Sequence, residues 1–142
     1  MSKDRLSLLP TLVVFGLAAA LSCARAAAIR PRTEIRIAAF HAALAYGMPN
    51  VAGAHLHLHH VINCLVAPSN PHFDPHVLEP CRGLGHGALN DVAASSPAHI
   101  LIARAFALAL RAEASRNFTA VHTLAGRIHA DLLRALAALP KP

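Results

Sequence analysis

Four histidines and one cysteine fall within ten residues of this chain, from His55 to Cys64. A neutral imidazole needs one hydrogen-bond acceptor and one donor, so burial alone is a poor reason to gather four rings. A transition metal ion would satisfy several of them at once. On a helix, His55 and His59 lie one turn apart, whereas His57 and His60 form a second pair on a neighbouring face.

The spacing therefore predicts a metal site whose remaining ligands come from other elements. His55, His59 and His60 are the preferred ligands, followed by His57 and His86, with His41 or His122 contributing if the site faces the helical core. Histidine nitrogen, together with the thioether of Met48 in an oxidising compartment, favours copper, with zinc or nickel as alternatives.

Three other functions compete with metal binding. A b-type haem needs only one or two axial histidines, such as His41 or His55 with His122, although few aromatic residues are present to line a haem pocket. No catalytic motif with supporting context is found, so we expect no enzyme. The third alternative is a structural or protein-interaction helical bundle whose histidines are incidental or sense pH.

The N-terminal segment has the pattern of an export signal. Lys3 and Arg5 precede an apolar run, and Ala24-Arg25-Ala26 is a cleavage pattern, which predicts a signal peptide over residues 1–26. The run is short for a membrane anchor and contains Pro10 and Gly16. A lipid-modified Cys23 is a further alternative. We therefore expect a bacterial protein that is periplasmic or secreted.

The cysteines that remain after cleavage are Cys64 and Cys81. An even pair in an exported chain favours a disulfide, which would remove both sulfurs as metal ligands. If the pair were reduced, Cys64 would join the histidines as a soft ligand for Cu(I) or Zn(II).

The charge of the remaining chain is modest. After residue 26 there are ten Lys and Arg against six Asp and Glu, dispersed along the sequence, whereas all eleven histidines remain. Such a distribution does not predict a nucleic-acid partner. No later segment is apolar and long enough to predict a membrane span.

Apolar periodicity predicts four helices in residues 27–142. They cover 34–46 after a Thr33 cap, 51–66 after Asn50, 97–114 after Ser96 and 118–139 after Asn117. A strand with alternating His55, His57 and His59 is the rival for the second helix, but the alternation is short. A loop rich in Pro and Gly fills residues 67–96. The predicted fold is an all-α four-helix bundle in one domain.

The segment from His57 to Leu65, followed by Glu79-Pro80-Cys81 and the glycines 83, 85 and 87, resembles a group of uncharacterised small exported bacterial helical proteins. Their shared features are a His-Leu-His-His-x-Ile-Asn-Cys-Leu segment and a second Pro-Cys. The resemblance covers residues 55–91 and implies an exported bundle with paired cysteines and a histidine cluster, but no reaction. Glu79 stands where the group has Asn.

Overall fold

The computed structural model describes residues 30–141, and this part of the chain is all-α, with five helices and no strand. The all-α prediction is confirmed. The predicted signal peptide, its cleavage site and the lipid-modified Cys23 lie outside the described residues.

The first two helices form an antiparallel pair. Helix α1 covers Pro31–Gly47 and helix α2 covers Val51–Leu65. The side chain of Asn50 accepts a hydrogen bond from the Gly53 N–H at 2.8 Å, so the predicted Asn50 cap is confirmed. The strand alternative for His55 to His59 is wrong, because the apolar stripe of period 3.6 is much longer than the alternation of period two.

The prediction that Thr33 caps α1 is wrong. The helix begins at Pro31 after an Arg30 cap that has no side-chain hydrogen bond. Proline suits the first helical position because its missing N–H would have no partner there. The Arg30 N–H instead donates to the Leu84 carbonyl at 2.9 Å, so the loop fixes where α1 starts.

Helix α4 covers Pro97–Glu113 and helix α5 covers Phe118–Ala138. Both predicted caps are confirmed, since the side chains of Ser96 and Asn117 accept hydrogen bonds from backbone N–H groups of the first helical turns. The sequence did not predict the short helix α3, which covers Ala88–Asp91 inside the expected loop.

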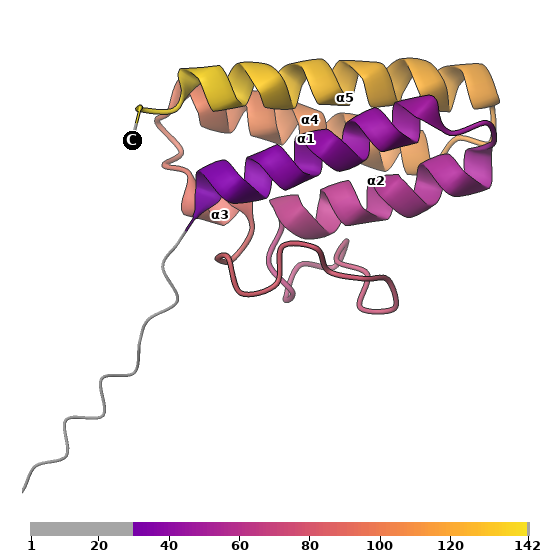
Figure 1. Cartoon of the computed structure of the whole chain (residues 1–142). Helices are drawn as coiled ribbons and strands as arrows, with labels where there is room; N and C mark the ends of the chain where they lie inside the picture. The colour runs from indigo at the N-terminus through magenta and orange to yellow at the C-terminus, as the bar shows by residue number, and fades with distance from the viewer. Residues whose placement is uncertain (1–29, 142) are drawn as a thin grey trace, which may run out of the picture.

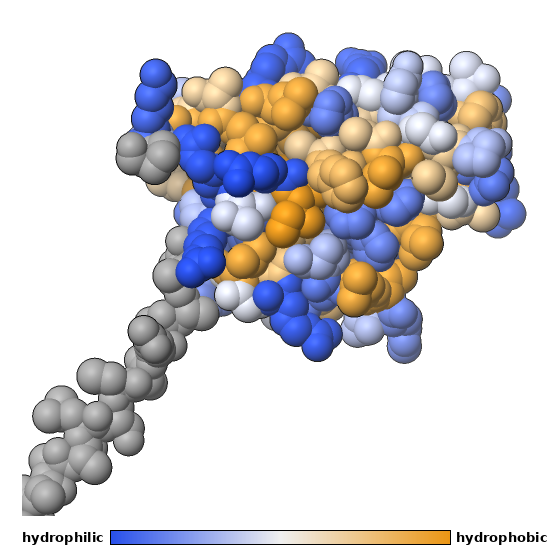
Figure 2. Space-filling model, viewed as in Figure 1, coloured by the Kyte–Doolittle hydropathy of each residue, from blue (hydrophilic) through white to orange (hydrophobic). Residues whose placement is uncertain are grey.

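The four longer helices pack side by side, with α1 between α2 and α5, and α4 against α5 and α2 (Figure 1). Many core positions are alanine, which allows close approach of the helix backbones. The largest fully buried aliphatic side chains include Ile35, Leu58, Ile62, Leu65, Ile102, Ile128 and Leu132. Figure 2 shows hydrophilic and hydrophobic side chains interspersed over the visible face. In the described part of the chain, no helix is both long and apolar enough to cross a membrane.

The segment between α2 and α4 is tied to the helices by a disulfide. Cys64 and Cys81 are bonded, with 5.2 Å between their Cα atoms, which confirms the predicted pairing. Cys64 is therefore not a thiolate ligand in this structure. The Asn63 side chain adds two hydrogen bonds to the backbone of Asp74, at 2.8 and 2.9 Å. Gly87 has φ of 90°, and a Cβ there would lie 2.4 Å from the Val66 carbonyl carbon.

Candidate metal centre

Three histidines from the α1–α2 pair bring their ring nitrogens together. His41 is on α1, and His57 and His60 are three positions apart on the face of α2 that meets α1. The Nδ1 atom of His41 lies 3.2 Å from Nδ1 of His57 and 3.3 Å from Nδ1 of His60. We call His41, His57 and His60 the histidine triad.

The two separations from His41 are compatible with nitrogens that share one metal ion. Zinc–nitrogen bonds of about 2.0–2.1 Å at tetrahedral angles hold two ligand nitrogens about 3.3–3.4 Å apart. One ligand atom from each ring of the triad lies within 4.8 Å of the other two. The triad thus has the number, type and spacing of donors that could hold a transition metal ion.

The electrostatics of the triad favour neutral rings. Burial is the main reason that the pKa of His41 falls from 6.5 to about 4, and the charges of His60 and His57 lower it further. The pKa of His60 is lowered by burial and then by His57 and His59. Near neutral pH these two rings therefore have a free nitrogen lone pair, which is the form that binds metals.

Hydrogen bonding alone is a poor explanation for the arrangement. The Nδ1 of His41 faces two other Nδ1 atoms but can either donate one proton or accept with one lone pair. At least one of the two contacts is then weak or shared, whereas a metal ion would accept all three lone pairs.

The triad is only partly enclosed. His60 is 7% exposed, His41 and His57 are half-buried, and the exposed Phe40 ring meets the His41 ring edge to face. Within residues 30–141, the group includes no Cys, Asp or Glu ligand. An ion held there would have three protein ligands and an open position.

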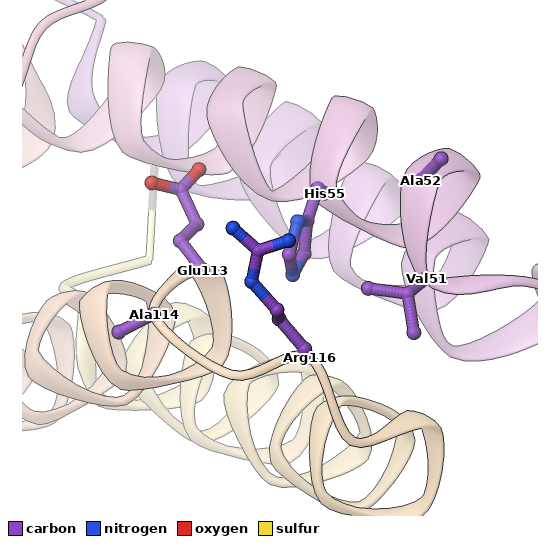
Figure 3. Close-up of a pocket in the computed structure, with 6 residues that line it drawn as sticks. All are labelled: Val51, Ala52, His55, Glu113, Ala114 and Arg116. Atoms are coloured by element: carbon purple, nitrogen blue, oxygen red, sulfur yellow. The ribbon is translucent and has the colours of Figure 1, made fainter.

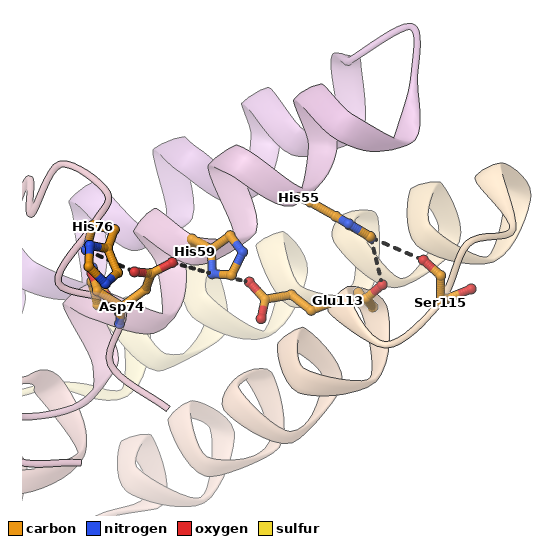
Figure 4. Close-up of polar contacts among 8 residues, drawn as sticks. His55, His59, Asp74, His76, Glu113 and Ser115 are labelled. Carbon is orange, nitrogen blue, oxygen red and sulfur yellow. Dashed lines mark hydrogen bonds and ion pairs between the residues drawn. The ribbon is translucent and has the colours of Figure 1, made fainter. Parts of the chain in front are cut away.

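His55 and His59 lie on another face of α2, away from the triad. Both point toward the C-terminal end of α4, as Figure 4 shows. The Nε2 of His55 lies 3.2 Å from the Ala112 carbonyl oxygen and 3.0 Å from that of Ser115, so it can donate to the end of α4. These two rings share a face of α2, as the sequence predicted. They do not converge with the His60 ring on a common point, which the predicted ligand set required.

The ring of His59 lies between two carboxylates. Its Nδ1 is 2.9 Å from Oε1 of Glu113 and 3.7 Å from Oδ2 of Asp74. Burial, and next the charge of Asp74, raise the pKa of Glu113 from 4.5 to about 7. His59 thus links the loop and α4 to α2.

The remaining two candidates are also separate from the triad. The Nδ1 of His86 lies 3.3 Å from Oδ1 of Asp91, at the surface of the loop. The ring of His122 stacks on Tyr46, with 4.0 Å between centroids, and also contacts Phe118. His41 contacts the other members of the triad and His55 contacts the end of α4, so haem binding by His41 or His55 with His122 stays a prediction.

A pocket of about 640 Å³ opens beside α2, on the face that carries His55. Figure 3 shows the Arg116 side chain extending toward His55, with Glu113 at the side. The other lining residues are Val51, Ala52 and Ala114. The pocket does not include the triad.

The sequence named all three members of the triad as candidates but ranked two of them below His55 and His59. The signal that identifies the triad is the spacing of three between His57 and His60, combined with His41 on the core side of the preceding helix. Comparisons with protein-family models, curated proteins and solved structures found no match to this chain.

Proposed function

We propose that this chain is an exported metal-binding protein with a four-helix bundle fold, and that the histidine triad holds one transition metal ion. The observation that carries the proposal is the convergence of three Nδ1 atoms, two of them at 3.2 and 3.3 Å from the third. Export is supported by the Cys64–Cys81 disulfide, since such bonds persist in oxidising compartments.

The donor set suits several transition metals. Three imidazole nitrogens can bind copper, zinc or nickel, and in an oxidising compartment we propose copper as the bound metal, with zinc or nickel as alternatives. The Met48 thioether, which supported copper in the sequence, lies against Gly53, one turn of α2 before His57.

An open coordination position suits an ion that is exchanged. Structural zinc sites are closed by four protein ligands, whereas three ligands leave room for water or for a donor from another molecule. His41 and His57 are half-buried, so an approaching group could reach the ion. We retain the expectation that this is no enzyme.

Two double variants on one helix test the triad. In His57→Ala/His60→Ala, one ring is left and stoichiometric binding of Zn2+ or Cu+ should be lost. The fall in affinity should exceed the roughly 10- to 100-fold that loss of a supporting residue costs. The measurement is metal titration by calorimetry on protein purified without a histidine tag, together with metal content after purification.

The matched control is His55→Ala/His59→Ala, which removes the same number of imidazoles from the same helix. It should retain one bound ion per chain, although it loses contacts to α4 and should be less stable. The proposal fails if the control loses the ion while the triad variant keeps it, or if the wild-type protein binds neither metal. Circular dichroism establishes that both variants fold.

A further inference from the structure

Glu34 is a buried carboxyl group that lies apart from the histidine triad. It is in the first turn of α1 and only 1% exposed. Its Oε1 accepts a hydrogen bond from the Gly87 N–H at 3.2 Å, whereas Oε2 has no partner among residues 30–141. A buried carboxyl group with one unpartnered oxygen is costly in free energy when it is charged.

A second carboxyl group meets Glu34 across Gly85. The Asp91 side chain is 3% exposed, and its Oδ2 accepts the His86 N–H at 2.7 Å. A Cβ added at Gly85 would lie 1.9 Å from Asp91 Oδ2 and 2.9 Å from Glu34 Oε1, so the two oxygens face one small space. Helix α3, which ends at Asp91, lies beside the start of α1 (Figure 1).

Two buried carboxyl groups this close cannot both be ionised without strong repulsion. Burial, and next the charge of Asp91, raise the pKa of Glu34 from 4.5 to about 7, despite the opposing effects of the Gly87 N–H and His86. A cation is a poorer occupant than a proton, because backbone N–H groups already point at one oxygen of each carboxyl group.

The charged groups nearby do not replace the proton. His86 is the titratable neighbour from the loop, and its Nδ1 lies 3.3 Å from Oδ1 of Asp91, but its side chain is 71% exposed, so solvent screens its charge. On α1, the Arg32 guanidinium extends to carbonyl oxygens at the end of α5, including Leu136. Toward α2, the neighbour is the Cys64–Cys81 disulfide, which does not titrate; a Cys81 sulfur lies 3.9 Å from the Glu34 carbonyl oxygen.

We propose that Glu34 and Asp91 hold one proton between them, and that this proton fastens the segment 85–91 onto α1. The segment opens as the pair loses the proton. This device is independent of metal binding and would make the attachment of the loop sensitive to the pH of the compartment.

Proton linkage determines whether closure of the segment strengthens or weakens as the pH rises. A carboxyl group whose pKa is raised in the closed form binds its proton more tightly there than in the open form. Closure is therefore favoured at low pH and weakens as the pH rises from 4.5 toward about 7. Because the open form still binds some proton at pH 5 and the closed form has lost half of its proton at pH 7, the opening constant should rise by about fortyfold between these two pH values.

Hydrogen exchange of the Gly87 amide, which donates to Glu34, measures this opening directly. Its protection factor, corrected for the intrinsic exchange rate, should fall by about fortyfold from pH 5 to pH 7. The Ile128 amide in α5 reports opening of the whole molecule and should not follow the same course. Protection at Gly87 that is constant over this range would overturn the proposal.

Three variants assign the effect to the pair. Glu34→Gln resembles the protonated side chain permanently, so Gly87 should remain protected at both pH values. Glu79→Gln, in the same loop, should behave as the wild type, and Gly85→Ala should lower protection at both pH values by placing a Cβ against Asp91. A pH slope retained in Glu34→Gln, or protection restored by added Ca2+ at pH 7, would contradict proton sharing.

Discussion

Asp131 on α5 is a buried charge that joins two helices. Its side chain is 3% exposed and accepts two hydrogen bonds from Arg104 of α4, at 2.6 and 2.7 Å, with a further contact from Arg134. Burial alone would raise the pKa of Asp131, but the hydrogen bonds and charges of the two arginines outweigh it, and the pKa falls below 3.8. The carboxylate is therefore stabilised in its charged form.

Asp131→Asn should destabilise the protein at pH 7 by about 1–2 kcal/mol, because charge-assisted hydrogen bonds are replaced by weaker ones. The stabilisation from a carboxyl group with a lowered pKa is present above 3.8, the ordinary value, and is lost as the pH falls through the folded value. Urea unfolding at pH 7 and pH 3 measures both effects. Equal stability of the two proteins at pH 7 would refute this role.

At the scale of residues, the sequence predicted that histidines gather, and the structure shows which of them lie together. His57 and His60 were predicted as a pair on one face, but the preferred ligands were His55, His59 and His60, and His57 and His41 were placed after them. Periodicity places residues on a face of their own helix. It does not say which face meets α1 and which meets α4, and that depends on tertiary packing.

At the scale of elements, the predicted helices match closely where a side chain caps the first turn, as at Asn50, Ser96 and Asn117. The start of α1 was misplaced because its first turn is fixed by Pro31 and by a backbone bond from Arg30 to Leu84, which is remote in sequence. Helix α3 was missed because four residues are too few for a periodic signal.

The disulfide constrains the segment between α2 and α4, and its reduction should destabilise the fold. The two cysteines are 17 residues apart, and closing a loop of that length contributes about 3 kcal/mol in the chain-entropy model. Urea unfolding with and without a reductant should show a lower midpoint in the reduced protein. Cys64→Ala/Cys81→Ala is the control, which a reductant should leave unchanged; equal midpoints for oxidised and reduced wild type would contradict this expectation.

At the scale of the whole molecule, the polar clusters each join neighbouring elements around a largely aliphatic core. The histidine triad joins α1 to α2, the Glu34–Asp91 pair joins α1 to α3, and Asp131 joins α4 to α5. An ion in the triad would link two helices that are already adjacent. We therefore expect metal binding to proceed without a change of fold.

Histidine side-chain NMR of the wild-type protein tests the central claim most directly, because it resolves individual rings among the eleven. One equivalent of Zn2+ should shift the ring nitrogen signals of His41, His57 and His60, with Nδ1 as the bound atom. The signals of His55, His59, His86 and His122 should change little. A Zn2+ ion bound by His55 and His59, or no change at the triad, would contradict the proposed function.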